Sequence, residues 1–112
     1  MKKITVKDVP IADTPHKVEV RPLFSFEHAT FVKIVLQPGE TLKKHITPVD
    51  AIFYGLKGTG VVEIGEECEE ISSEELVFSP KGIPHKLLNE NSEPFEFLVI
   101  KVPTQTSKSQ IL

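Results

Sequence analysis

Histidine is a scarce side chain in this sequence that can both bind metals and transfer protons near neutral pH. The chain has four histidines, one cysteine and no tryptophan in 112 residues. Neutral imidazoles bind divalent metals and exchange protons near neutral pH. A lone Cys68 can form neither an internal disulfide nor a cysteine-based zinc site. We therefore look for chemistry around His16, His28, His45 and His85.

Short apolar segments separated by turn residues predict the elements that position these histidines. Nine prolines and six glycines are spread along the chain and leave no room for a long amphipathic helix. Between them, β-branched and aromatic residues gather at 18–24, 30–36, 51–56, 60–65, 75–79 and 95–102. This spacing is typical of an all-β sandwich or barrel. The last segment is apolar on nearly both faces, as expected for a strand covered on both sides.

Two local patterns surround His45 and His85, namely GETLKKHITPVDAIFYGLKG at 39–58 and EELVFSPKGIPHKLLN at 74–89. In both, the chain resembles the cupin superfamily, small jelly-roll barrels of two packed antiparallel sheets. The positions that match the two cupin motifs are Gly39, His45, Gly58, Pro80, Gly82, His85 and Asn89. Glu74 replaces the glycine that opens the second motif. The resemblance covers about half of the chain and implies an all-β, double-stranded β-helix fold.

The ligand set that the resemblance implies is incomplete. In metal-binding cupins, two histidines and a glutamate of the first motif and one histidine of the second hold a divalent metal. Here Thr47 stands for the second histidine, and Ala51, or Ile52 with the longer spacing, stands for the glutamate. His45 and His85 remain as candidate ligands for one ion such as Fe, Mn, Ni or Zn. Two imidazoles are fewer than the three or four protein ligands of most such sites.

Asp50 is the nearest carboxylate that could replace the missing glutamate. It lies one residue before the glutamate position, and a step of one residue on a strand turns a side chain to the opposite face. A tight turn at residues 47–49 would allow Asp50 to reach inward as a weak metal ligand. The commoner role of such an aspartate is to bind local backbone donors. Both roles remain open.

The motif spacing places His45 and His85 in a pocket inside the barrel. Alternate residues of a strand face the same side, so we expect Thr47, Phe53 and Leu87 to line this pocket as well. The histidines then either ligate a metal or bond to each other, to water or to a ligand. The sequence leaves this choice open.

A single domain over residues 1–112 accounts for the whole chain. We expect residues 1–15 to form an N-terminal arm and residues 104–112 a flexible tail. His16, directly after the arm, and His28, in a turn-like stretch, have no motif context. They are interpreted as surface residues.

Charge and composition limit the partners. The net charge is −3, which argues against a nucleic-acid-binding face. Seven glutamates lie between Gly58 and Pro80, and we interpret this acidic segment as a solvated hairpin edge. No apolar run approaches the roughly 18 residues of a membrane span. The start of the chain lacks the pattern of a secretory signal, and a lone cysteine suits the cytoplasm. Because residues 52–56 carry an apolar outer face and the arm resembles one that small cupins exchange, we also expect a homodimer.

Three functions fit these observations. The first is a binding protein that holds a small polar or anionic molecule with His45, Thr47 and His85, with no assigned reaction. The second is a metal-dependent enzyme, such as a dioxygenase, isomerase or decarboxylase, acting on a small organic substrate. The third is an accessory dimer whose pocket is a relic. The fold cannot choose among them, but the missing ligands favour the binding protein, and catalytic residues stay unassigned.

Overall fold

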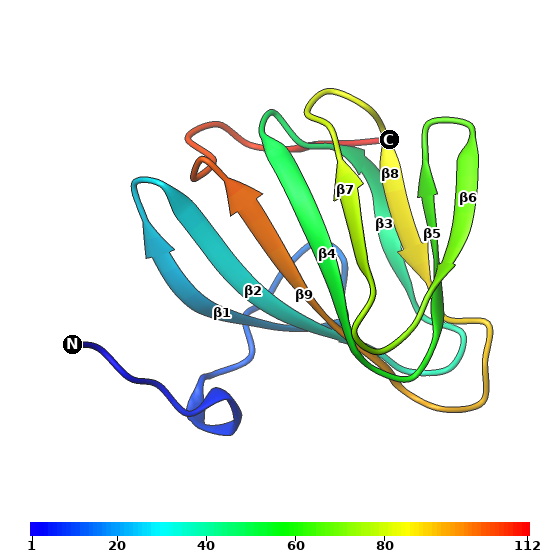
Figure 1. The fold of residues 1–112 in the computed structure, drawn as a ribbon, viewed down its shortest axis with the longest axis horizontal. Coiled ribbons are helices and arrows are strands. Elements are labelled where there is room, and N and C mark those ends of the chain that lie inside the picture. Colours follow the sequence, from blue (N-terminus) through cyan, green and yellow to red (C-terminus); the bar gives the residue numbers. More distant parts are fainter.

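The computed structural model describes residues 1–112 and consists of two five-stranded antiparallel sheets that pack face to face (Figure 1). The first sheet has the order β1–β2–β9–β4–β7, and the second has the order β10–β3–β8–β5–β6. The strands are β1 (Glu19–Phe26), β2 (Ala29–Leu36), β3 (Thr41–Ile46), β4 (Asp50–Lys57), β5 (Gly60–Ile64), β6 (Glu67–Ile71), β7 (Leu76–Ser79), β8 (His85–Leu88), β9 (Phe95–Val102) and β10 (Gln110–Ile111). The predicted all-β architecture is confirmed. No helix is long and apolar enough to cross a membrane.

Alternating side chains on β9 build the centre of the first sheet. This strand lies between β2 and β4, and Phe95, Phe97 and Val99 are buried towards the second sheet. On the opposite face, Leu98 and Ile100 are only half-buried. The sequence predicts cover on both faces of this strand. The structure corrects this, because β9 packs against other strands on its inner face and has its outer face partly open.

The hydrophobic core lies between the two sheets. Apolar side chains point inward from both, as the two-residue period of a strand requires. The core comprises Val20, Ile34, Leu36, Leu42, Ala51, Phe53, Val62, Ile71, Leu87, Phe95, Phe97 and Val99. The rings of Phe95 and Phe97 stack with their centroids 4.8 Å apart. This core holds together the strands that carry His45 and His85.

Left-handed backbone at two turn positions shapes the entry to β5 and β7. Gly58 has φ +75°, and a Cβ there would lie 2.2 Å from the carbonyl oxygen of Pro94, so only glycine fits. Glu74, which replaces the opening glycine of the second motif, also adopts a left-handed φ of 65°. A residue with a Cβ adopts this conformation at a cost in free energy. The backbone therefore keeps a glycine-like turn where the sequence has lost the glycine.

Asn89 has a structural role at the end of β8. Its buried side-chain amide donates hydrogen bonds to the carbonyl oxygens of Leu36 and Glu93, at 2.9 and 2.8 Å. Its main-chain carbonyl oxygen accepts a hydrogen bond from the backbone N–H of Gly39 at 2.8 Å. Asn89 thus ties the loop before β3 and the loop before β9 to β8.

The N-terminal arm is held against β1 by hydrogen bonds. It contains a short 3₁₀ helix over Val6–Asp8. The Arg21 guanidinium donates to the carbonyl oxygens of Lys7 and Val9, and the Ala12 N–H donates to the Val20 carbonyl at 2.8 Å. These bonds direct the residues that follow the arm towards the inside of the barrel.

The C-terminal tail, predicted to be flexible, ends in a short strand. Gln110 and Ile111 form β10 and pair with Ile46 and His45 of β3. Earlier in the tail, the Thr104 N–H donates to the Glu27 carbonyl in the turn between β1 and β2. The tail therefore runs from the first sheet to the edge of the second (Figure 1). Its backbone finds partners at the otherwise open edge of β3, which composition alone does not reveal.

Candidate functional site

An irregularity in β3 turns His45 into the barrel. Leu42 pairs with Leu87 and His45 pairs with His85, so three residues on β3 span the same distance as two on β8. One extra residue of this kind is a β-bulge, which changes the direction of a side chain. Without it, strict alternation from buried Leu42 would point His45 outward. With the bulge, His45 and His85 are 8% and 3% exposed and lie opposite each other on the neighbouring strands β3 and β8.

The two histidines form the centre of a buried hydrogen-bond network. Their Nε2 atoms are 3.1 Å apart. The hydroxyl oxygen of Thr47 lies 3.1 Å from His85 Nε2, and that of Ser79 lies 2.7 Å from His85 Nδ1. His45 Nδ1 lies 2.6 Å from the carbonyl oxygen of Lys43. Ser79 belongs to β7, so its bond to His85 on β8 connects the two sheets.

These contacts assign one consistent set of neutral tautomers. A carbonyl oxygen only accepts, so His45 must donate from Nδ1 to Lys43, which leaves a lone pair on His45 Nε2. His85 Nε2 then donates to His45, and the Ser79 hydroxyl donates to the lone pair on His85 Nδ1. Burial lowers the pKa of both imidazoles, and for His85, with added repulsion from His45 and Lys101, the value falls to about 4. Both rings are therefore neutral at pH 7.

The network borders a cavity of about 160 Å³, called here the histidine cavity. One part of its wall is apolar and comes from both sheets, and the polar part consists of imidazoles, hydroxyls and one ammonium group. The lining residues are Thr14, His16, Val20, Val32, Ile34, Leu42, His45, Thr47, Ala51, Phe53, His85, Val99 and Lys101. With a volume per water of about 30 Å³, the cavity has space for about five waters or a small organic molecule.

His16 lies on the wall of this cavity, and its interpretation as a surface residue is wrong. Its ring centroid is 5.0 Å from that of His45, and its Nδ1 accepts a hydrogen bond from the Lys43 N–H at 3.0 Å. Burial, followed by repulsion from His45 and Lys43, lowers the pKa of His16 to about 4. The bonds between the arm and β1 bring it here, and these long-range contacts leave no local sequence signal. His28, by contrast, is exposed at the turn after β1.

Two further groups of the site are absent from the sequence-based set of candidates, namely Ser79, which bonds to His85, and Lys101, which lines the cavity. Strand parity could have found both. Ser79 shares a face of β7 with Val77, and Lys101 shares the inner face of β9 with Phe97 and Val99. Burial lowers the pKa of the Lys101 ammonium group. The apolar composition of residues 95–102 concealed a lysine that points inward.

The other predicted pocket residues take different positions. The Phe53 ring packs edge-on against the His85 ring, with centroids 5.2 Å apart, and lines the cavity. Thr47 and Ala51 line it as well. Leu87, in contrast, is fully buried in the core and is not part of the cavity wall. Asp50 also lies outside the wall, and its carboxylate accepts a hydrogen bond from the Lys81 N–H at 2.9 Å.

The donor set does not fit the full metal centre that the cupin motifs imply. No group of three or more histidine, cysteine, aspartate or glutamate side chains is arranged to hold a metal ion. Next to the two converging imidazole nitrogens, the further side-chain donor is the neutral hydroxyl of Thr47, which is a weak ligand for first-row metals. Ala51 offers no donor, and the Asp50 carboxylate is bound to a backbone turn.

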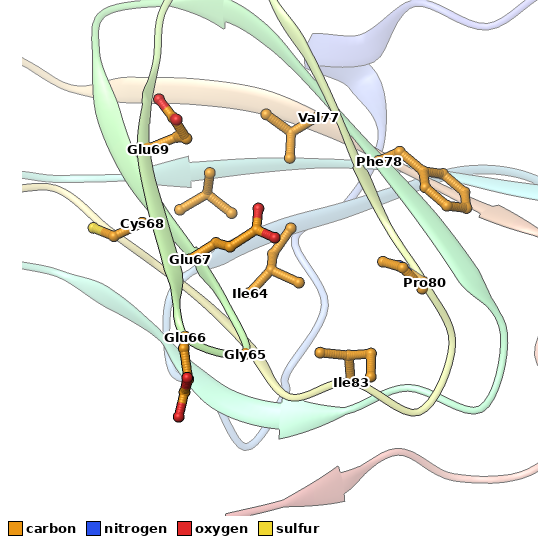
Figure 2. Close-up of a pocket in the computed structure, with 11 residues that line it drawn as sticks. Ile64, Gly65, Glu66, Glu67, Cys68, Glu69, Val77, Phe78, Pro80 and Ile83 are labelled. Atoms are coloured by element: carbon orange, nitrogen blue, oxygen red, sulfur yellow. The ribbon is translucent and has the colours of Figure 1, made fainter.

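A second hollow, called here the acidic groove, lies between the edge strands β6 and β7 and the turn at Pro80–Ile83 (Figure 2). Its volume is about 570 Å³. Ile64 and Val77 supply apolar walls, Glu67 and Glu69 line it from β6, and Cys68 points away from it. No residue of the histidine network lines this groove. Its charges are exposed to solvent.

Comparison with known proteins agrees with this architecture. The protein TT1209 from Thermus thermophilus is 31% identical, with a TM-score of 0.79, and the match covers 92% of this chain and 98% of that protein. The polyketide cyclase RemF from Streptomyces resistomycificus is 18% identical with a TM-score of 0.86, covering 100% of this chain and 85% of that one. A predicted oxalate decarboxylase from Thermotoga maritima is 22% identical with a TM-score of 0.83, covering 92% and 100%. No curated protein matches the sequence.

The family assignment rests on the sequence match together with the fold. The model of the cupin domain matches residues 32–101, which include most of β2 to β9 and both motif histidines. Solved structures with the same fold include an RmlC-like cupin from Shewanella frigidimarina, 14% identical with a TM-score of 0.81, which covers 92% of this chain and 91% of its own. The chain therefore belongs to the cupin superfamily.

Proposed function

We propose that this cupin binds a small organic molecule in the histidine cavity, with His45, His85 and Thr47 as the groups that orient it. The observation that carries the proposal is the fixed hydrogen-bond network at the cavity wall. Ser79 and the Lys43 carbonyl hold the two imidazoles in defined orientations. Groups held in this way bind a ligand without a further loss of side-chain entropy.

The composition of the cavity supports a ligand with both polar and apolar parts. Small-molecule sites are mostly apolar and carry a few converging polar groups. Seven of the 13 lining residues are hydrophobic, and the polar ones include the histidine pair and Thr47. A volume of about 160 Å³ limits the ligand to a small molecule. No reaction is assigned, because these contacts support binding without identifying a bond that is made or broken.

Nuclear magnetic resonance of the histidine side chains tests this proposal. Butyrate, butyramide and 1-butanol are titrated separately into the protein while the ring ¹⁵N signals of His45, His85 and His28 are followed. We expect saturable shifts at His45 and His85 with at least one probe and none at His28, which is exposed. Thr47→Val, which keeps the shape but removes the hydroxyl, should weaken binding. Shifts of equal size at His28, or no saturable shift with any probe, would overturn the proposal.

A metal-dependent enzyme is the second candidate, and one distance favours it. Two imidazoles that bind one metal at right angles have their nitrogens about 3 Å apart, and the Nε2 atoms of His45 and His85 are 3.1 Å apart. Metal binding through Nε2 would require the His85 proton to move from Nε2 to Nδ1. The Nδ1–H group would then donate to the Ser79 hydroxyl oxygen, which can accept a hydrogen bond. The candidate ions are Fe, Mn, Ni and Zn, with further ligands supplied by water or substrate.

Elemental analysis separates the two candidates. The protein is purified without chelator, alongside His45→Ala and the control His28→Ala. For a metal-free binding protein we expect substoichiometric metal in all three samples. Stoichiometric metal in the wild type and in His28→Ala, lost in His45→Ala, would establish the metal site and replace the first candidate.

We further propose a homodimer in the cytoplasm. Leu76 and Phe78 on the edge strand β7 are 65% and 60% exposed, which leaves apolar surface for a second copy. Cys68 is free and exposed, as suits a reducing compartment. Light scattering of the wild type and of Phe78→Ser tests the dimer. A monomeric mass for the wild type would contradict it.

A further inference from the structure

We propose that Lys101 makes the histidine cavity selective for a small carboxylate with a short apolar chain. This inference rests on the proposed binding function and names the chemical class of its ligand. It starts from the position of Lys101 on β9, where it pairs with Thr30 of β2 and Ala51 of β4. The lysine is thus on a central strand of the sheet and not at its edge.

The ammonium group of Lys101 has no partner in the protein. The four ion pairs of the structure join Lys17 to Asp13, Arg21 to Glu19, His28 to Glu27 and Lys33 to Glu96. None of the side-chain hydrogen bonds involves the Lys101 amino group. Its nitrogen is not among the fully buried polar atoms without a partner, so water solvates it in the free protein and an anion would replace that water. Burial also lowers the pKa of Lys101, consistent with an ammonium group that lacks a counter-charge.

The wall around Lys101 contains no group that could supply this counter-charge. The chain has 16 aspartates and glutamates, yet none lines the histidine cavity. Its polar side chains besides Lys101 are Thr14, His16, His45, Thr47 and His85. Positive charge on Lys101 contributes to the lowered pKa of all three histidines. The same positive charge would attract an anion at this position, and the anion would in turn stabilise the charged form of Lys101.

A further hollow, distinct from the acidic groove, gives an anion a route to Lys101. Lys101 is the one residue shared by the histidine cavity and a polar hollow beside the C-terminal tail. That hollow is lined by Ser25, Thr30, Lys101, Thr104, Gln105, Thr106, Ser107 and Lys108, again without an acidic residue. Lys101 therefore stands at the boundary between the solvent-facing hollow and the histidine cavity.

The rest of the cavity selects a carboxylate over a more highly charged anion. Val32, Ile34 and Val99 contribute apolar surface next to a single ammonium group. One lysine and a few neutral donors match the charge of one carboxylate, whereas an inorganic phosphate dianion would have no apolar part to bury. The arrangement therefore fits a short-chain monocarboxylate, with its oxygens at Lys101 and its alkyl chain against the valines and isoleucine.

Isothermal titration calorimetry with butyrate, butyramide and inorganic phosphate tests the inference. The proteins are the wild type, Lys101→Met and the control Lys57→Met. Lys57 is exposed at the end of β4 on the same sheet, so both variants lose one charge and keep a side chain of similar length. We expect butyrate to bind the wild type and Lys57→Met equally, and Lys101→Met at least about tenfold more weakly, since a charge-assisted bond is lost. Butyramide should bind weakly and with the same affinity in all three.

The outcomes distinguish this inference from the proposed function. Equal binding of butyrate and butyramide, or undiminished butyrate binding to Lys101→Met, would overturn the carboxylate selectivity and leave a neutral-ligand cavity intact. Phosphate binding tighter than butyrate would overturn the ligand class. No binding of any probe to the wild type, together with unchanged histidine ¹⁵N signals, would overturn both the inference and the proposed function.

Discussion

The histidine cavity and the acidic groove lie between the same two sheets but are built from opposite side chains. The cavity is small, and its polar wall consists of three imidazoles, two hydroxyls and one ammonium group. The groove is larger and open, lies between the edge strands β6 and β7, and carries Glu66, Glu67 and Glu69. In the cavity, the imidazoles are held by protein partners and shifted in their pKa by burial. In the groove, the charges are solvated.

This difference shows that size alone does not identify a site. The groove of about 570 Å³ exceeds the cavity of about 160 Å³. The smaller hollow nevertheless contains the groups whose protonation and orientation the fold controls. Buried polar groups cost free energy, so a fold that maintains several of them close together marks a candidate functional site.

The largest expected contrast comes from one phenylalanine in each hollow. Phe53 of the cavity is 1% exposed and Phe78 of the groove is 60% exposed. We expect Phe53→Ala to lower the free energy of unfolding by about 3–5 kcal/mol, because it removes a buried ring that packs against both the core and His85. At protein concentrations low enough to keep the chain monomeric, Phe78→Ala should cost less than about 1 kcal/mol. Urea denaturation measures both, and equal losses would show that the groove is as tightly packed as the cavity.

The pH dependence of stability should belong to the cavity. Folding lowers the pKa of His85 from 6.5 to about 4, so between these values the unfolded chain binds more protons than the folded one. The contribution of His85 to the free energy of unfolding is therefore fully present above pH 6.5. It falls as the pH drops towards 4, by on the order of 2 kcal/mol. His16 acts in the same direction. Urea denaturation between about pH 4.5 and about pH 7 should show a smaller fall in His85→Gln than in the wild type.

The matched control for this pH series is His28→Gln, which changes an exposed histidine at the turn after β1. It should follow the wild-type curve at every pH. If His85→Gln and His28→Gln lost the same stability on acidification, the buried network would not be the source of the pH dependence.

A pair of serines tests the hydrogen bonding of a buried and an exposed hydroxyl more finely. The Ser79 hydroxyl bonds to His85 Nδ1 in the fully buried network, whereas the exposed Ser73 hydroxyl donates to the Leu56 carbonyl at 3.0 Å. Ser79→Ala leaves a buried nitrogen without a partner and should cost about 1–2 kcal/mol. Ser73→Ala should cost less than about 0.5 kcal/mol, since water replaces the bond. Thermal unfolding of both variants checks this order, and the reverse order would contradict the proposed network.

The smallest expected effect concerns the charges of the groove. Glu67 and Glu69 share one face of β6 within a run of glutamates. Glu67→Gln should change stability by no more than about 0.5 kcal/mol, in the stabilising direction, because it relieves repulsion between exposed charges. The gain should shrink at high salt, where such repulsion is screened. A loss of stability that is independent of salt would instead indicate a specific contact of Glu67.

Much of the fold was predictable because its signals are local. Strand segments and turn residues predicted a β-sandwich or barrel, and the resemblance of the two motifs to cupins predicted two packed sheets with His45 and His85 in one pocket. The same local signals were misleading for His16, which has no motif context, and for Lys101, which is concealed in an apolar strand. Ser79 was overlooked although its parity with Val77 points it inward. Parity arguments succeed only where the strand is regular, and the bulge between Leu42 and His45 interrupts that regularity.

By itself, the sequence determined the cupin fold, the facing pair His45 and His85, and the loss of two family ligands at Thr47 and Ala51. These follow from residue identity and spacing within the two motifs, through their resemblance to the cupin motifs. Only the tertiary structure decided that His16 joins the pair, that Asp50 binds the Lys81 backbone instead, and that Leu87 lies in the core. The physical reason is that these placements depend on hydrogen bonds and packing between segments far apart in the chain. Local pattern carries no record of such contacts.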